Sequence, residues 1–347
     1  IMKIAFDAKR YFHNSSGLGN YSRTLVDGLK SKYASELEIN LLNKPNGAPT
    51  WWRSFGMGKA ASKWGADIFH GLSNELPFDL PGSVKKVVTI HDVLFKSRPD
   101  DYPFFDSLIY DLKTQDALKR ADVIIATSEF TASEIKKYYA AEIDKYFFRK
   151  KLNIKVLYQS ISTKYSINSW QPNLEAPYLI YHSSFVSRKN HLNLVTAFSK
   201  VCHLFPHNLI LAGKGNLENE LRKTIDRLQL NDRVKIFQFP SDEVLEKLLV
   251  ESSGFIYPSF SEGFGIPLVE AATIGIPIAA SNIPVFQELM RGVSSTIWFN
   301  PENVEAISQG ILDLIKSKYP NYSSLITRMD ESAICKQYFD IYQSLID

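Results

Sequence analysis

The sequence predicts an α/β protein with two Rossmann-like domains, each a doubly wound parallel sheet. The chain has 347 residues, more than one hydrophobic core usually organises, so two domains are expected. Short runs of β-branched and aromatic residues alternate with amphipathic helical stretches, which indicates parallel sheets covered by helices. A polar stretch interrupted by prolines, residues 162–177, divides this alternation and is interpreted as an interdomain linker.

The first half is expected to form the N-terminal domain, residues 1–165. Its short apolar runs predict strands at Lys3–Phe6, Ile39–Leu42, Asp67–His70, Lys85–Ile90, Val123–Thr127 and Lys155–Leu157. Helical periodicity between them predicts helices at Asn20–Lys32, Phe104–Lys119 and Thr131–Tyr139. Ser128 and Glu129 before the last of these are typical of a helix cap followed by an acidic first turn.

The second half repeats the alternation over residues 174–325 and predicts a second domain. Its strands are expected at Tyr178–Tyr181, Asn208–Ala212, Val234–Phe237, Gly254–Tyr257, Ile276–Ala280 and Thr296–Phe299. Its helices are expected at His191–Leu204, Leu217–Leu228, Asp242–Glu251, Val285–Arg291 and Val304–Lys318. A final helical stretch, Ser324–Ile346, exceeds what this sheet needs, so residues 326–347 are treated as a separate C-terminal helix.

Composition narrows the class of protein. The net charge of +3 is too small to indicate nucleic-acid binding. Cys202 and Cys335 lack metal-ligand spacing and are expected to be reduced thiols in a cytoplasmic protein. No apolar run approaches the roughly 18 residues that span a bilayer, and the first predicted strand begins at once, so neither a membrane span nor a signal peptide is expected.

Basic and aromatic residues are mixed in one segment, residues 145–155. Two interpretations stay open: a helix end with its aromatic residues in the core, or a patch that contacts anionic lipid headgroups on the inner face of a membrane. The residues are Lys145, Tyr146, Phe147, Phe148, Arg149, Lys150, Lys151 and Lys155.

The most informative segment runs from Glu262 to Glu270. Two carboxylates are separated by seven residues that form a glycine-rich bend, and Pro267 suits the first turn of a helix, where its missing N–H costs nothing. Glycines let the backbone approach a ligand, and the amides of a helix start favour a phosphate. Two solvated surface glutamates are the alternative interpretation.

This segment resembles the E-x7-E motif of the retaining nucleotide-sugar glycosyltransferases of family four, which have the B-type fold. The resemblance implies two domains that face a central cleft, a C-terminal helix that crosses back to the N-terminal domain, and a nucleotide-diphosphate sugar as donor. It also implies that no cofactor or metal is needed. In such enzymes the N-terminal domain binds the acceptor and the C-terminal domain binds the donor.

The resemblance also implies roles for the residues of the segment. Glu270 would bind the ribose hydroxyls of the donor. Glu262 would hold the transferred sugar and stabilise positive charge at its anomeric carbon. The backbone around the bend would contact phosphate and sugar, through Gly263, Phe264, Gly265 and Ile266.

A second segment, Ser187 to Asn190, follows a predicted strand and precedes a predicted helix. Cations at a helix start oppose the helix dipole, so Arg188 and Lys189 are interpreted as ligands of an anion rather than as solvated side chains. The segment resembles the phosphate loop of the same family, which implies that both residues bind the donor diphosphate.

Three further places at strand ends are candidate sites. Gly17 and Gly19 resemble the family's N-terminal glycine loop over the donor diphosphate, although a plain turn is the alternative. His91 follows a strand and, by the resemblance, contacts the transferred sugar, with a core or capping histidine as the alternative. Lys214 ends another strand and is expected beside the nucleotide.

Phe6-Asp7-Ala8-Lys9-Arg10 and the Arg188-Lys189 loop look most like bacterial mannosyltransferases of surface-polysaccharide assembly. The resemblance favours GDP-mannose as donor, with a UDP-hexose second, and a glycan or lipid-linked glycan as acceptor. Three alternatives stay open: an epimerase of the same fold acting on a UDP-sugar, a non-catalytic partner subunit, and a nicotinamide-dependent oxidoreductase supported only by the weak Gly17-Leu18-Gly19 pattern.

Overall fold

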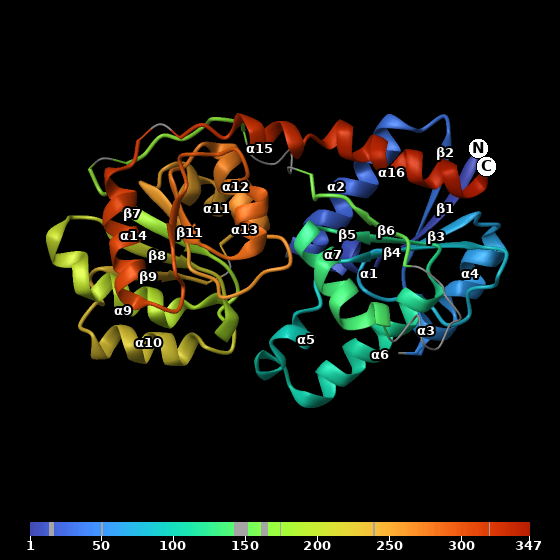
Figure 1. Ribbon diagram of the computed structural model, residues 1–347, viewed down its shortest axis with the longest axis horizontal. Helices are drawn as coiled ribbons and strands as arrows, with labels where there is room; N and C mark the ends of the chain where they lie inside the picture. Colours follow the sequence, from blue (N-terminus) through green and yellow to red (C-terminus); the bar gives the residue numbers. More distant parts are fainter. Residues whose placement is uncertain are drawn as a thin grey trace. The chain divides into compact units, whose positions relative to one another are not determined.

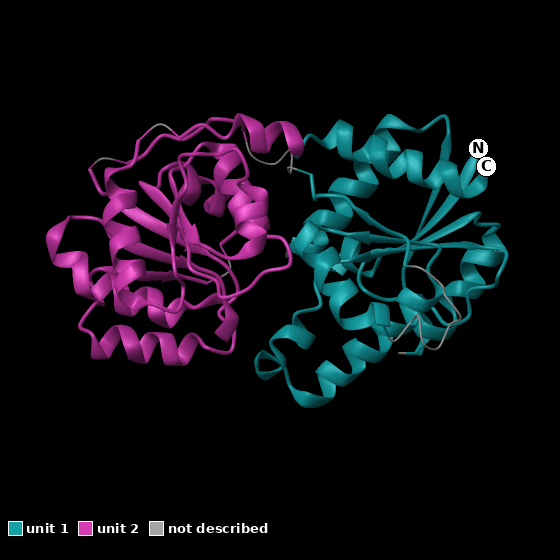
Figure 2. Ribbon diagram, viewed as in Figure 1, with its two compact units in different colours: residues 1–162, 329–347 teal, residues 163–328 magenta. Residues whose placement is uncertain are grey.

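The computed structural model describes residues 1–13, 17–49, 51–141, 152–160, 166–173, 175–238, 240–318 and 320–347. The chain forms two compact units (Figure 2). Unit 1 contains Ile1–Ser162 together with Met329–Asp347, and unit 2 contains Thr163–Arg328. The chain therefore passes from unit 1 to unit 2 and returns.

Unit 1 is built on a six-stranded parallel sheet with the strand order β2-β1-β3-β4-β5-β6 (Figure 1). From β1 the chain moves to the edge at β2, then returns to β3 on the other side of β1. The change of direction between β1 and β3 is the crossover point of the sheet. The strands are β1 (Met2–Asp7), β2 (Leu37–Leu42), β3 (Ile68–Gly71), β4 (Lys85–Ile90), β5 (Val123–Ala126) and β6 (Ile154–Val156).

Helices cover both faces of this sheet because successive strand side chains point to opposite sides. Ile4 and Phe6 pack on one face and Ala5 on the other. The helices and short helical turns are α1 (Lys9–His13), α2 (Gly17–Lys32), α3 (Trp52–Phe55), α4 (Met57–Trp64), α5 (Leu94–Ser97), η1 (Pro99–Asp101), α6 (Phe104–Arg120), α7 (Glu129–Ile135), η2 (Lys136–Ala140) and α16 (Glu331–Ile346).

The C-terminal helix α16 belongs to unit 1, as the family resemblance implied. Its buried residues Ile334, Cys335, Tyr338 and Tyr342 share one hydrophobic cluster with β1 and α2. The predicted continuous helix over Ser324–Ile346 was wrong, because it divides into α15 (Ser323–Arg328) and α16. The side chain of Asp330 accepts a hydrogen bond from the backbone N–H of Ala333 at 2.9 Å and so starts a new helix at this point.

Unit 2 repeats the architecture with the strand order β12-β11-β10-β7-β8-β9, and its crossover point lies between β7 and β10. The strands are β7 (Tyr178–His182), β8 (Asn208–Ala212), β9 (Val234–Phe237), β10 (Gly254–Tyr257), β11 (Ile278–Ser281) and β12 (Ile297–Phe299). The helices are η3 (Ser187–Lys189), α9 (His191–Val201), η4 (Cys202–Leu204), α10 (Glu218–Arg227), α11 (Asp242–Val250), α12 (Ile266–Ile274), α13 (Pro284–Leu289), α14 (Val304–Lys316) and α15.

The polar stretch predicted as a linker is largely part of unit 2. The boundary between the units falls at Ser162, and described residues 166–173 lie against unit 2. The backbone N–H groups of Trp170 and Gln171 donate to the carbonyls of Ile274 and Val250, at 3.0 and 2.9 Å. Residues 166–173 form neither helix nor strand, but these backbone hydrogen bonds hold them on unit 2.

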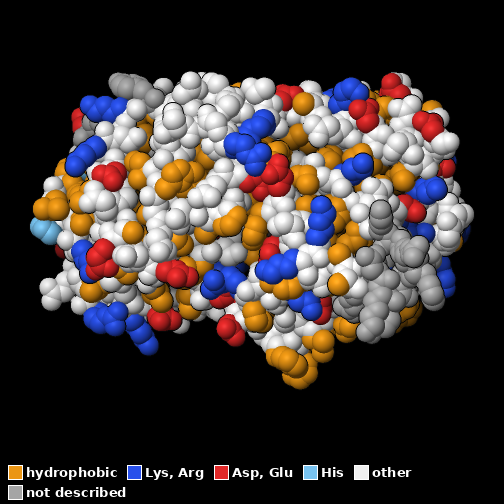
Figure 3. All heavy atoms as spheres, in the orientation of Figure 1, with side chains coloured by type: hydrophobic (Ala, Val, Ile, Leu, Met, Phe, Trp, Pro, Cys, Tyr) orange, Lys and Arg blue, Asp and Glu red, His pale blue; other side chains and the backbone are white. Residues whose placement is uncertain are grey.

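Large apolar side chains are exposed at the start of α6, where Figure 3 shows hydrophobic groups at a projecting tip. Such a contiguous patch often marks an interaction surface. The exposed residues are Phe104, Phe105, Leu108, Ile109 and Leu112.

No helix in the described ranges is both long and apolar enough for a membrane span. Of the basic-aromatic segment 145–155, residues 145–151 lie outside the described residues.

Candidate functional site

The candidate site of unit 2 lies at the carboxyl ends of β7 and β10, on either side of the crossover point. In doubly wound sheets the loops diverge there and leave a crevice for a ligand. The loop after β7 carries Arg188 and Lys189, and the loop after β10 carries Glu262. The backbone N–H of Phe260 donates to the carbonyl of Arg188 at 2.9 Å, which ties the two loops together.

A buried carboxylate between two cations forms the centre of this site. One oxygen of Glu262 accepts from the ammonium of Lys189, and the other lies 3.0 Å from Nη1 of Arg188. The hydroxyls of Ser259 and Tyr257 also donate to Glu262, at 2.7 and 3.1 Å. Glu262 and Lys189 are only 5% and 7% exposed, so the ion pair is held largely away from water.

These contacts determine the charge of Glu262. Burial alone would raise the pKa of its carboxyl, but the charges of Lys189 and Arg188 and the hydrogen bonds from Lys189 and Ser259 outweigh burial and lower it to about 2. Glu262 is therefore a carboxylate at any physiological pH and does not act as a general acid. Lys189 and Arg188 thus bring two cationic groups to one carboxylate, a cluster of the kind that can receive an anionic ligand.

The second glutamate of the segment lies on the helix that follows. Glu270 is buried in α12, and its carboxylate lies 3.1 Å from Nε2 of His182, at the end of β7. The helix begins after Gly265, whose φ of +114° suits glycine. A Cβ on Gly265 would lie 2.7 Å from the ring of Phe286, so this glycine permits packing within the protein.

Lys214 is presented by a loop that packs tightly on the loop after β7. A Cβ on Gly213 would lie 1.9 Å from the carbonyl oxygen of Ser183, and one on Gly215 would lie 2.2 Å from that of Phe185. The backbone N–H of Phe185 donates to the carbonyl of Lys214 at 2.7 Å. The two glycines therefore let the loops meet and leave the Lys214 side chain exposed.

The structure thus brings Arg188, Lys189 and Glu262 into direct contact, and it places Glu270 of α12 against His182, at the end of β7. Gly263 and Phe264 lie in the connection from β10 into α12, where Phe264 is buried, and Ile266 is the first residue of α12. The roles predicted for these residues toward a donor stay predictions.

Sequence reasoning missed several polar residues that support this site. His182 pairs with Glu270, and Tyr257 and Ser259 bond to Glu262. Asn190 adopts φ of +60° and donates to the carbonyls of Pro258 and Pro301, at 3.0 and 2.8 Å. Their position at strand ends was the available signal, because polar residues at the carboxyl edge of a parallel sheet are often functional.

His91, Gly17 and Gly19 belong to unit 1. His91 follows β4, with Nε2 2.9 Å from the carbonyl oxygen of Leu72 and its ring edge-on to Tyr21. The predicted glycine loop was wrong in one respect, since Gly17 and Gly19 lie in the first turn of α2. The helix extends back because buried residues continue at helical spacing to Gly19. The predicted contacts of all three with a donor stay predictions.

Two Rossmann-like units, one with a cluster of charged side chains at its crossover point, define a doubly wound α/β protein, a class in which ligands bind at the carboxyl ends of the strands. Residues 163–333 match the family model described as glycosyl transferases group 1. Residues 163–333 therefore form a glycosyl transferases group 1 domain, as the resemblance predicted.

Relatives agree with this assignment. The chain is 27% identical over 264 residues to O-antigen chain mannosyltransferase B of Escherichia coli, which covers 72% of this chain and 65% of that protein. It is 24% identical over 249 residues to O-antigen chain mannosyltransferase RfbU of Salmonella typhimurium, which covers 71% and 65%. The matched part thus spans less than two thirds of either relative.

A solved structure shows the same fold. HepE of Anabaena, crystallised with UDP and glucose, superposes with a TM-score of 0.71 at 17% identity, over 99% of this chain and 100% of that chain. This likeness confirms two Rossmann-like units of the B type.

Proposed function

We propose that the protein is a retaining glycosyltransferase that moves a hexose, with mannose favoured, from a nucleotide-diphosphate sugar to a glycan or lipid-linked glycan of a surface polysaccharide. The observation that carries this proposal is the buried carboxylate of Glu262 held by Lys189 and Arg188 at the crossover point of unit 2. The names of the two relatives, both O-antigen mannosyltransferases, support the choice of sugar.

The arrangement suits a donor whose diphosphate is anionic and whose sugar becomes positive during transfer. Arg188 and Lys189 supply positive charge for the diphosphate, and Lys214 adds to it. Glu262 is ionised and faces the developing charge at the anomeric carbon, which is electrostatic stabilisation of the transition state. Glu270, a buried acceptor beside His182, binds the ribose hydroxyls of the nucleotide.

The proposal extends to partners and location. The reaction needs no metal or other cofactor, since cationic side chains meet the diphosphate. The protein works in the cytoplasm and contacts the inner face of a membrane, where lipid-linked acceptors lie. The exposed apolar side chains at the start of α6 support this contact, because aromatic and aliphatic groups enter the headgroup layer.

A ligand-binding screen tests the proposal. The melting temperature is measured with UDP, GDP, ADP and their hexose conjugates, and GDP or GDP-mannose is expected to raise it most. A ligand at 100 times its Kd stabilises the folded state by about 2.7 kcal/mol. Glu270→Ala should reduce the shift, and Glu305→Ala, an exposed glutamate of α14, should not.

The products are then analysed with and without a glycan acceptor. Transfer of the sugar with retained anomeric configuration is expected only with the acceptor. No shift with any nucleotide would remove the proposal, and conversion of a UDP-sugar to its epimer without acceptor would replace it with the epimerase.

A further inference from the structure

A histidine at the candidate site of unit 2 contacts one of the two glutamates directly. His182 is the last residue of β7, and its Nε2 lies 3.1 Å from Oε2 of Glu270 in α12. The two residues are 88 positions apart in the sequence, so only the folded unit brings them together. Both side chains are largely buried, with 16% of His182 and 7% of Glu270 exposed.

The surroundings of Glu270 make this contact important. Glu270 is the one charged residue of α12, which is otherwise apolar apart from Thr273, and the residues from Leu268 to Ile274 are all buried. A carboxylate in such surroundings is costly unless a partner compensates it. Among the residues that the structure describes, His182 is hydrogen-bonded to Oε2, and none is hydrogen-bonded to Oε1. One oxygen of Glu270 is therefore held, and the other is left for a ligand.

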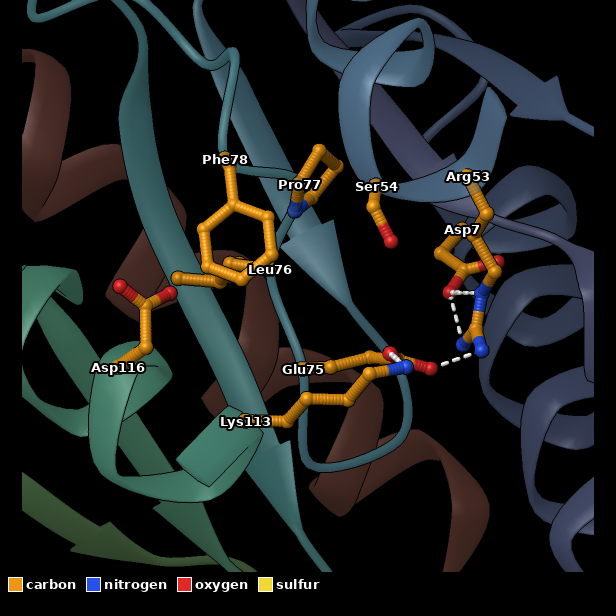
Figure 4. A pocket seen from close by; sticks show the side chains of 9 residues that line it. All are labelled: Asp7, Arg53, Ser54, Glu75, Leu76, Pro77, Phe78, Lys113 and Asp116. Carbon is orange, nitrogen blue, oxygen red and sulfur yellow. Dashed lines mark hydrogen bonds and ion pairs between the residues drawn. The ribbon is translucent and has the colours of Figure 1, made fainter. Parts of the chain in front are cut away.

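Other carboxylates near strand ends are compensated at both oxygens. Figure 4 shows Glu75, which follows β3 in unit 1, paired with Arg53 through one oxygen and with Lys113 through the other, the latter at 2.7 Å. In unit 2, two cations divide the oxygens of Glu262 in the same way. Glu270 pairs with no described Lys or Arg, so its second oxygen is open to a hydroxyl group.

We propose that His182 is a positioning residue that fixes the carboxylate of Glu270 for the ribose of the donor nucleotide, and that it thereby sets selectivity for ribose over its deoxy analogues. A carboxylate only accepts hydrogen bonds, so Nε2 of His182 carries the hydrogen and donates. With Oε2 held in this way, Oε1 meets a ribose hydroxyl already oriented, which reduces the cost of binding. The inference rests on the proposed function, since it specifies what the donor site recognises in the nucleotide.

The strand that carries His182 gives it a fixed position. β7 lies between β10 and β8 in the sheet, and the His182 ring lies against that of Phe255 in β10, with 6.0 Å between the ring centroids. The preceding residue, Tyr181, has its hydroxyl 3.2 Å from Oγ of Ser259, which donates to Glu262. Consecutive residues of one strand therefore support the two glutamates of the site.

Nucleotide binding to the full chain is measured by calorimetry with GDP and UDP, each beside its 2′,3′-dideoxy analogue. His182→Leu removes the N–H donor and should raise the Kd of the ribonucleotide about tenfold, as for a lost hydrogen bond to a charged group, and that of the dideoxy analogue less than about twofold. His182→Gln keeps an N–H at a similar reach and should bind within about threefold of wild type. His203→Leu, which removes an exposed histidine of unit 2, is the control and should bind as wild type.

A double variant tests whether His182 acts through Glu270. In the Glu270→Ala background, His182→Leu should cause no further loss of affinity, because the carboxylate that it positions is already absent. Additive losses would contradict the inference, since they would mean that His182 contacts the nucleotide independently.

Three further results overturn the inference: ribonucleotide binding by His182→Leu equal to that of wild type, equal weakening of the ribonucleotide and its dideoxy analogue, or a His182→Gln variant as weak as His182→Leu. Equal weakening would mean that His182 only stabilises unit 2. If the wild type binds neither GDP nor UDP, the proposed function fails and the inference falls with it, so the two failures are distinguishable.

Discussion

At the scale of single residues, Glu262 is the centre of the site. Four groups converge on its carboxylate: Lys189, Arg188, Ser259 and Tyr257. Such a side chain can stabilise positive charge, but it has no proton to give at neutral pH. Its replacement therefore separates an electrostatic role from a merely structural one.

Glu262→Gln keeps the shape of the side chain and removes its charge. We expect kcat to fall at least 100-fold, about 3 kcal/mol of transition-state stabilisation, with little change in KM for the donor. Steady-state kinetics with varied donor measures both constants. Glu305→Gln, which removes an exposed carboxylate paired with Lys200, is the control and should behave as wild type. A wild-type kcat for Glu262→Gln would contradict the assignment.

The same variant has a defined effect on acid stability. The pKa of Glu262 is about 2 in the folded protein, against an ordinary value of 4.5, so the unfolded chain takes up this proton first. The ionised carboxylate of Glu262 therefore adds to the free energy of unfolding above pH 4.5, and this contribution is lost as the pH falls toward 2. Unfolding measured from pH 5 to 2 should therefore depend less on pH in Glu262→Gln than in the wild type.

The sequence predicted some of these residues and missed others for a physical reason. Glu262, Lys189 and Arg188 were found because each lies in a local pattern, a glycine bend or a basic pair before a helix. His182 and Tyr257 lie at the ends of ordinary apolar strands. The pairing of β7 with β10 brings His182 near Glu270, whereas Tyr257 is only five residues from Glu262. Their position at strand ends was the available signal, since no local sequence pattern identifies the hydrogen-bond partner of either side chain.

At the scale of elements, α16 is held on unit 1 by a buried network of side chains. Nδ1 of His70 lies 2.7 Å from the hydroxyl of Tyr342, and Nε2 lies 2.8 Å from that of Thr89. Tyr21 links Thr89 to Tyr338 of the same helix, at 2.8 and 2.9 Å. The helix is thus docked by polar contacts as well as by apolar burial.

Tyr342→Phe should destabilise unit 1 by about 1–3 kcal/mol, because it leaves a ring nitrogen of buried His70 without a partner. Denaturant unfolding measures this change. Tyr33→Phe is a matched control: the ring of Tyr33 stacks on Phe339 of α16 at 4.2 Å, and the substitution keeps that contact. Equal stabilities of the two variants would show that the hydroxyl network contributes nothing.

The same histidine makes the docking of α16 sensitive to acid. Burial, with a smaller effect of His91, lowers the pKa of His70 to about 3, so below pH 6.5 the unfolded chain binds the proton and the folded one does not. His70 therefore makes the stability of unit 1 fall as the pH decreases from 6.5 toward 3.

Strand positions were predictable from hydrophobic runs. The network around His70 was not predictable, because it joins residues that are 272 positions apart in the sequence.

At the scale of the whole molecule, segments that are adjacent in the sequence do not always belong to the same unit. Residues Met329–Asp347 follow unit 2 directly in sequence but belong to unit 1, where they complete a hydrophobic cluster with Ile4, Phe6 and Leu25. The alternation of strands and helices predicted two domains because each half repeats the same pattern. It did not predict that residues 166–173 would pack on unit 2, since irregular backbone hydrogen bonds have no periodicity.

Deletion of Met329–Asp347 should therefore unfold unit 1 and leave unit 2 folded. The deletion uncovers the cluster around Phe6 and removes the four buried side chains of α16. The burial of each contributes about 1.5–3 kcal/mol, so their sum is comparable to the 5–15 kcal/mol that stabilises an ordinary domain. Hydrogen exchange should show rapid exchange in β1 and β3 and continued protection in β7 and β10. Removal of Ile346 and Asp347 alone, both exposed, is the control. Rapid exchange in β7 and β10 would contradict this prediction, because it would mean that unit 2 depends on α16 for its stability. Continued protection of β1 would also contradict it, because it would mean that unit 1 folds without α16.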